Sequence, residues 1–326
     1  MDITSQNNIK TSSVEIKDRH IKIDRRLFFL LVFAGPAIAY MLGVATSLSK
    51  VNAYFRAQTG EVVGETQNTS EIEAAVFPTR GIEVKARWGA VLPELVAKGV
   101  IDMNKFTTMF EQSGEPLSEA YKTILAAPQD GLPIVFSSET ARFTVDALWA
   151  LGLAQESDVL LKGPMSEDKS STGRFASTGG WTLGKSENAM DYYAKWNLLG
   201  LSSEDQVRVT RIAESVYRSC CGNSTAFPDC NHGMAMLGLI ELMVSQDASD
   251  EDIYDAAKAA NTYWFPDSTL EMAMYLQQKG LEWKDAEANV VVGKDYASGE
   301  AARRIHQELQ DSGVLPQPKG GGSCGA

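Results

Sequence analysis

Three cysteines and one histidine lie within a thirteen-residue stretch of this sequence, a density that suits metal binding. Cys220 and Cys221 are adjacent, and after eight intervening residues Cys230 is followed closely by His232. Thiolate and imidazole groups are preferred ligands of Zn²⁺, Cu(I) and other soft or borderline ions, and three cysteines with one histidine complete a tetrahedral shell. The pattern therefore predicts a Zn or Cu site made by these four side chains.

The fourth cysteine extends this prediction to the end of the chain. Cys324 lies two residues before the C-terminus, just after a run of three glycines. Because a Gly-rich segment behaves as a flexible chain, we expect the tail 316–326 to present Cys324 as an exchangeable fifth ligand. The ligand order matches neither the common zinc fingers and ribbons nor the C-x-x-C-H motif that attaches c-type haem.

Two other kinds of chemistry fit the same cysteines. In a thiol–disulfide redox protein, Arg218 and the N-terminus of the following helix would lower the pKa of one thiol and make it a better nucleophile. In an exported protein the cysteines would instead form structural disulfides, for which four cysteines allow three pairings. The chain would then be a disulfide-stabilised interaction module at the cell surface. The sequence leaves open whether the protein is an enzyme.

Two further features are weaker candidates for a functional role. Glu241 lies in the apolar segment 233–245, where it is either a neutral core acid or a group that supports the cluster. The segment 163–187 is a long loop rich in Ser, Gly and Lys that also contains Trp181. Long loops in compact domains are often functional, so we expect this loop to cover the metal site, with its aromatic part packed.

An apolar segment near the N-terminus predicts a membrane anchor. Residues 27–48 contain no charged side chain, and at about 1.5 Å per residue they are long enough to cross a membrane as a helix. Six Lys or Arg residues precede this segment, which places the N-terminus in the cytoplasm and the main domain outside it. A cleaved signal peptide is the alternative, because Ala37-Ile38-Ala39 resembles a cleavage site.

The charge of the chain argues against a nucleic-acid partner. Residues 1–26 hold six basic and four acidic residues, which leaves 24 basic and 38 acidic residues in the remainder, a formal net charge of −14. An acidic surface of this kind repels a phosphate backbone. The predicted partners are therefore a membrane, through the N-terminal helix, and a metal ion.

Capping residues and apolar periodicity predict a mainly α domain. Asp102, Ser203 and Ser249 each precede a helical pattern, and Gly99 and Gly280 follow one. Only residues 82–88 resemble a strand. The predicted organisation is a cytoplasmic tail (1–26), a transmembrane helix (27–48), a stalk (49–80), a multi-helix extracytoplasmic domain (81–315) and a flexible tail (316–326).

Overall fold

The computed structural model of the protein describes residues 66–168 and 170–316. Helices dominate this part of the chain, so the prediction of a mainly α domain is confirmed. The predicted membrane segment, 27–48, and the tail cysteine, Cys324, lie outside the described residues. None of the helices in the described ranges is long and apolar enough to cross a membrane.

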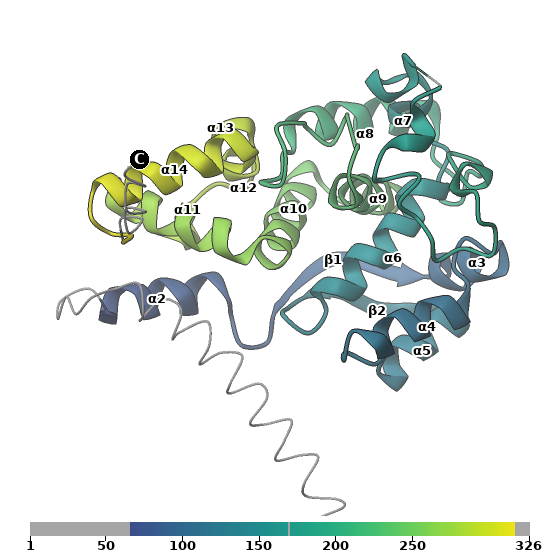
Figure 1. Ribbon diagram of the computed structural model, residues 1–326, viewed down its shortest axis with the longest axis horizontal. Coiled ribbons are helices and arrows are strands. Elements are labelled where there is room, and N and C mark those ends of the chain that lie inside the picture. The colour runs from purple at the N-terminus through teal and green to yellow at the C-terminus, as the bar shows by residue number, and fades with distance from the viewer. Residues whose placement is uncertain (1–65, 169, 317–326) are drawn as a thin grey trace, which may run out of the picture. The chain divides into compact units, whose positions relative to one another are not determined.

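Two apolar helices, α6 (Ala141–Ala154) and α9 (Asn231–Ser245), pack against each other in the core (Figure 1). Glycines allow their backbones to touch. A Cβ atom on Gly238 would lie only 2.4 Å from the carbonyl oxygen of Leu148 and 2.8 Å from the amide nitrogen of Gly152. The sequence predicts α9 as a central buried helix because it is apolar almost all round, and the structure confirms this.

A two-stranded antiparallel hairpin packs beside these helices. Strand β1 (Ile82–Gly89) pairs with β2 (Gln129–Phe136), so that Ile82 lies opposite Phe136. The first strand confirms the extended segment predicted at 82–88. The second was not predicted, because Gly131 and Pro133 interrupt its strand signal and its pairing depends on residues far away in the sequence.

Three short helices connect the two strands: α3 (Val91–Ala97), α4 (Met103–Gln112) and α5 (Glu119–Ala126). The two cap residues predicted in this region, Asp102 and Gly99, are both observed. The carboxylate of Asp102 accepts hydrogen bonds from the first amides of α4, and Gly99 ends the α3 turn with a φ of +74°.

The sequence predicts a helix from Ser203 to Cys220, with a capping box of Ser203 and Gln206, and the observed helix is shorter. Helix α8 (Ser203–Ser215) begins with a capping box formed by Ser202 and Asp205, one residue earlier than the predicted pair. It ends five residues before Cys220, which therefore lies in the following loop and not on the helix. The helix does not continue because the amide of Tyr217 donates a hydrogen bond to the backbone carbonyl oxygen of Val292, at 2.7 Å, which lies far along the sequence.

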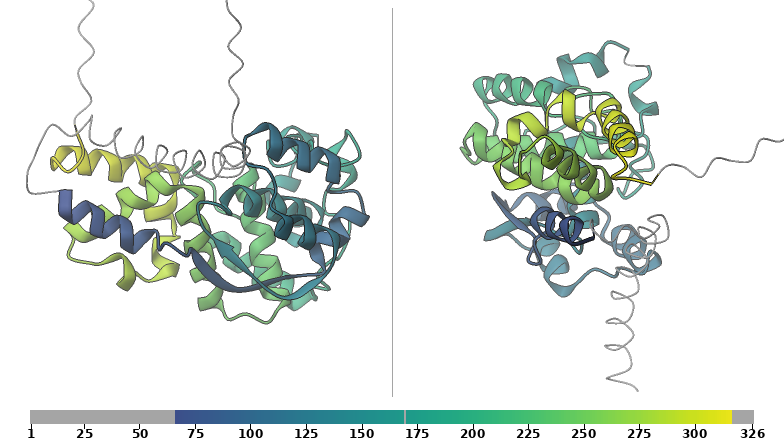
Figure 2. Two further views of the ribbon diagram at one scale, coloured as in Figure 1. Left: turned by 90° about the horizontal axis from the view of Figure 1, so that it is seen from below. Right: turned by 90° about the vertical axis from the view of Figure 1, so that its left-hand side faces the viewer.

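The C-terminal part of the chain is a further group of helices. The pattern of Ser268 and Glu271 in the sequence predicts a capping box that opens a helix. Helix α11 starts instead at Pro266, because proline suits the first helical position. Helix α2, at the end of the predicted stalk, packs against α11 (Figure 2). The bounds are α2 (Thr66–Val76), α10 (Asp250–Trp264), α11 (Pro266–Gln278), α12 (Ala288–Val291), α13 (Lys294–Ala297) and α14 (Gly299–Asp311).

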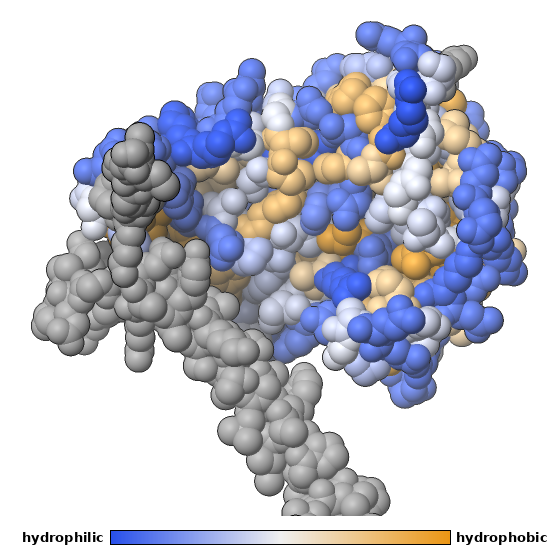
Figure 3. Space-filling model, viewed as in Figure 1, coloured by the Kyte–Doolittle hydropathy of each residue, from blue (hydrophilic) through white to orange (hydrophobic). Residues whose placement is uncertain are grey.

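The loop 163–187 follows a short helix, α7 (Asp158–Lys162), and the part of it that contains Trp181 is packed as predicted. Trp181 is 2% exposed and donates a hydrogen bond from Nε1 to the carbonyl oxygen of Val100 at 2.9 Å. On the face shown in Figure 3, apolar residues form small groups separated by hydrophilic ones. Short 3₁₀ turns complete the structure: η1 (Pro164–Ser166), η2 (Thr172–Arg174), η3 (Ala189–Asp191) and η4 (Trp283–Asp285).

Candidate metal centre

A buried arginine organises the loop between α8 and α9. Arg218 is only 1% exposed, and its guanidinium is surrounded by acceptors. Nη2 lies 2.7 Å from Oδ1 of Asp229, and Nε donates to Sγ of Cys230 at 3.1 Å. The remaining N–H groups donate to the backbone carbonyl oxygens of Asn223, Ser224 and Phe227. One side chain therefore fixes the course of the whole loop.

Neighbouring helices hold the same loop in place. The first amide of α14, at Gly299, donates to the carbonyl oxygen of Cys221 at 2.7 Å. From α10, Asn261 donates to the carbonyl oxygen of Tyr217 at 2.9 Å. Gly233, in the first turn of α9, leaves room for the arginine, since a Cβ there would lie 2.5 Å from its guanidinium. The cysteines thus lie on a loop that is fixed from three sides.

The three sulfur atoms meet in this loop. Sγ of Cys220 lies 3.6 Å from Sγ of Cys230, and all three sulfurs, including that of Cys221, lie within 4.8 Å of one another. Cys220 is exposed and the other two are half-buried, and all three are free thiols. Ligands at the corners of a tetrahedron with bonds of about 2.3 Å lie about 3.8 Å apart. The spacing of the sulfurs therefore fits a shared metal ion.

Cys230 carries the negative charge of the group. It is the N-cap residue of α9, where its sulfur accepts hydrogen bonds from the amide of Gly233 and from the guanidinium. The hydrogen bond from the thiol of Cys220, together with the arginine, lowers the pKa of Cys230 to about 5. The same hydrogen bond raises the pKa of Cys220, and burial raises that of Cys221. The metal-free group therefore holds one thiolate and two thiols at neutral pH.

The structure does not bring the predicted histidine ligand into this group. His232 is absent from the described set of metal-ligating atoms that lie within 4.8 Å of one another. Its ring packs against Phe265 and Trp264, with ring centres 4.6 Å and 6.0 Å apart. Burial lowers its pKa to about 4. Because successive residues of a helix point about 100° apart, the first turn of α9 directs His232 and Cys230 to different surroundings.

Of the other two predicted participants, Cys324 is outside the described residues, so the structure does not test its role, and Glu241 is remote from the cysteines. Glu241 lies eleven residues beyond Cys230 on α9, about 16 Å along the helix axis, so it does not contact the cluster. It is fully buried, which strongly raises its pKa, and neither carboxyl oxygen forms a hydrogen bond within the described part of the chain. Glu241 is therefore a neutral core acid.

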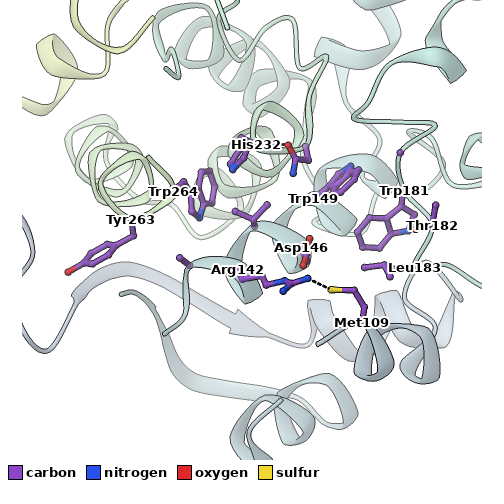
Figure 4. A pocket seen from close by; sticks show the side chains of 14 residues that line it. Met109, Arg142, Asp146, Trp149, Trp181, Thr182, Leu183, His232, Tyr263 and Trp264 are labelled. Atoms are coloured by element: carbon purple, nitrogen blue, oxygen red, sulfur yellow. Dashed lines mark hydrogen bonds between the residues drawn. The ribbon is translucent and has the colours of Figure 1, made fainter. Parts of the chain in front are cut away.

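A second feature lies on the other side of the first turn of α9. His232 and Asn231 line a cavity of about 460 Å³, together with residues of α6, α10 and the 163–187 loop (Figure 4). Asp146 and Trp149 of α6 also line it. Asp146 was not predicted from the sequence, although a single acid within an apolar, tryptophan-containing helix is a signal that could have revealed it.

Comparisons with known proteins do not add a relationship. No protein-family model, no curated protein and no solved structure matches the chain. The geometry and chemistry of its own residues are therefore what indicate its function.

Proposed function

We propose that this protein binds a soft or borderline metal ion, of the Zn²⁺ or Cu(I) type, through the thiolates of Cys220, Cys221 and Cys230. The observation that carries the proposal is the convergence of three sulfur atoms within 4.8 Å on a loop fixed by Arg218. Three thiolates suit these ions in particular, because sulfur is a soft ligand that hard ions such as Mg²⁺ and Ca²⁺ do not prefer.

The charges around the sulfurs also favour a cation. In the metal-free state the single positive charge of Arg218 lies beside two negative groups, Asp229 and the thiolate of Cys230. The other two thiols keep their protons, because the hydrogen bond to Cys230 raises the pKa of Cys220 and burial raises that of Cys221. A bound cation would supply the missing positive charge and would displace their protons.

The fourth ligand in this proposal comes from outside the three-sulfur group. The thiol of Cys324, on its Gly-rich tail, is our candidate, and a water molecule would occupy the position when the tail is released. An open or exchangeable position is typical of sites that react with or pass on a ligand, whereas structural zinc sites are closed.

We further propose that the domain is held at a membrane by the segment 27–48. This rests on the uncharged length of the segment and on the excess of basic residues before it. A maleimide that cannot cross membranes should label an engineered cysteine, Ser312→Cys, in intact cells when the four native cysteines are replaced by serine. Labelling that requires cell lysis would contradict an extracytoplasmic domain.

Metal analysis of the purified full-length chain tests the metal proposal. Under reducing conditions the wild-type chain should retain about one Zn or Cu ion per molecule, whereas Cys230→Ser and Cys221→Ser should retain less than a tenth of that amount. His306→Gln, a change in an exposed side chain of α14, is the matched control and should retain the full amount. Failure of the wild-type chain to bind either metal would overturn the proposal.

A dithiol redox site is the second candidate, and the contact between Cys220 and Cys230 favours it. The Cys230 thiolate would attack a partner disulfide and release one partner thiolate. Deprotonated Cys220 would then attack the mixed disulfide, releasing the second partner thiolate and leaving a Cys220–Cys230 disulfide. Rapid reduction of a model disulfide by the metal-free chain would favour this candidate if it is abolished in Cys230→Ser and stops at the mixed disulfide, with one partner thiolate released, in Cys220→Ser. A chain that binds metal but does not reduce the disulfide would exclude it.

A further inference from the structure

Three tryptophans give the cavity beside α9 rigid aromatic walls. Every indole N–H donates to a protein oxygen, at 2.6 Å for Trp149, 2.9 Å for Trp181 and 3.2 Å for Trp264. Trp149 and Trp181 also pack edge to face, with ring centres 5.0 Å apart. Because their donors are already used, the surface that these side chains offer a ligand is carbon. Trp181 and Trp264 are 2% and 8% exposed, so the half-buried ring of Trp149 contributes most of that surface.

A single carboxyl group lies among these rings. Figure 4 shows Asp146 near the centre of the cavity, with Trp264 and His232 on one side and Trp149 and Trp181 on the other. Within the described residues, Asp146 forms neither a hydrogen bond nor an ion pair. Asp146 is half-buried, and a carboxylate that faces an aromatic cavity without a protein partner is available to a cation.

The nearest basic residue does not serve as that partner. Arg142 lies one turn before Asp146 on α6, but its guanidinium donates a hydrogen bond to Sδ of Met109 at 2.8 Å. It also lies over the ring of Phe110, 5.2 Å from its centre. The arginine is therefore directed toward α4, which leaves the carboxylate facing the cavity.

We propose that this cavity binds a small organic cation of the alkyl- or quaternary-ammonium class, with Asp146 as its counter-ion. Tryptophan is the best aromatic partner for such cations, and a carboxylate beside aromatic walls supplies both charge and a π surface. A volume of about 460 Å³ is within the range of pockets that enclose small ligands. The proposal does not depend on the metal site, because none of its arguments uses the cysteines.

The protonation state of Asp146 gives a second way to detect a cation bound in the cavity. Burial raises its pKa to about 7, only partly offset by the charge of Arg142. The other titratable side chains that line the cavity are Arg142 from α6, His232 from α9 and Tyr263 from α10, and Arg142 is the one permanent positive charge among them. A bound cation would favour the ionised carboxylate, so binding at pH 7 should release about half a proton from Asp146. Calorimetry in two buffers of different ionisation enthalpy measures this release.

The experiment compares two probes of the same shape. Choline carries a quaternary ammonium group, and 3,3-dimethylbutan-1-ol is its neutral isostere. Titrated into the full-length chain and followed by tryptophan fluorescence and calorimetry, choline should bind at one site about tenfold or more tightly than the alcohol. This comparison uses the unaltered protein and so does not depend on the folding of a variant.

Variants then test the role of the carboxylate. Asp146→Asn should remove the preference for choline, whereas Asp255→Asn, which alters an exposed acid on α10, should retain it. Equal affinity for the two probes would show that the cavity takes a neutral ligand, and would overturn the proposal. Absence of choline binding, or a preference that survives in Asp146→Asn, would also overturn it.

Discussion

Nε of Arg218 donates a hydrogen bond to Sγ of Cys230 at 3.1 Å, joining the buried positive charge of the loop to its most acidic sulfur. A buried guanidinium is stable only when its charge and its N–H groups find partners. Here the partners are an aspartate, three backbone carbonyls and the thiolate that caps α9. The stability of the loop and the ionisation of Cys230 therefore depend on the same side chain.

The first prediction concerns the shape of this side chain. Arg218→Lys keeps the charge but cannot reach the five acceptors, so the free energy of unfolding should fall by about 2–4 kcal/mol. Arg303→Lys, an exposed substitution on α14, should change it by less than about 0.5 kcal/mol. Urea unfolding of both variants measures the difference. Equal midpoints for the two would show that the guanidinium fork does not hold the loop together.

The second prediction concerns the ionisation of Cys230 in the metal-free chain. The ultraviolet absorbance of the thiolate should titrate with a midpoint at a pH of about 5 and should disappear in Cys230→Ser. Cys220→Ala should raise the midpoint, because it removes the thiol that donates to the thiolate. Cys221→Ala serves as the control and should leave the midpoint nearly unchanged. A midpoint above pH 8 in the wild-type chain would contradict the assignment.

This ionisation also affects stability. The pKa of Cys230 is lower in the folded than in the unfolded chain, so the stabilisation is present above the unfolded value of about 8.5 and is lost as the pH falls through about 5. Cys230→Ser should therefore cost more stability at pH 8 than at pH 5. Unfolding by urea at the two pH values, with reductant present, checks the sign.

The third prediction concerns the contact between α6 and α9. Gly238→Ala would place a methyl group 2.4 Å from a backbone oxygen, and relieving that overlap requires the central helices to separate. We expect a loss of about 1–3 kcal/mol, as for other overpacked cores. Gly131→Ala, where the added Cβ meets nothing within 4 Å, should be close to neutral. Thermal unfolding compares the two, and a destabilisation of similar size in both would argue against the close contact.

The fourth prediction uses the buried acid on α9. Burial raises the pKa of Glu241, so the folded chain holds it protonated at a pH where the unfolded chain ionises it. Its contribution to stability is full below the unfolded value of about 4.3 and falls by up to about 1.4 kcal/mol per pH unit as the pH rises. Glu241→Met should thus stabilise the chain more at pH 7 than at pH 5.

Urea unfolding at the two pH values measures this effect, and we expect a gain of about 1–3 kcal/mol at pH 7. Glu214→Met, a change at an exposed position of α8, is the control and should show no such pH dependence. A gain of equal size at both pH values would mean that packing, and not ionisation, is responsible.

Local signals in the sequence were sufficient to predict most of the helices. Asp102 and Ser249 cap the helices that they were expected to cap, because an N-cap acts on amides only two or three residues away. Strand β2 could not be predicted in this way, since it is defined by pairing with β1, which lies more than forty residues earlier. The early end of α8 likewise depends on a bond from Tyr217 to a distant part of the chain.

The part of the candidate site that was predicted is the part that is local in sequence. Cys220, Cys221 and Cys230 are close in sequence, and a single loop brings their sulfurs together. The direction of His232 depends on how the first turn of α9 is oriented, which is set by packing against Trp264 and not by spacing. The cavity around Asp146 is built from segments distant in sequence, so it becomes visible only in the folded chain.

X-ray absorption spectroscopy of the metal-loaded full-length chain tests the central claim most directly, because it counts the sulfur atoms bound to the metal. The proposed site predicts at least three sulfur scatterers at about 2.3 Å, with a fourth sulfur that is lost in Cys324→Ser. His232→Gln should leave the spectrum unchanged, because the ring of His232 packs against aromatic residues. A first shell of only nitrogen and oxygen atoms would contradict a metal centre built from these cysteines.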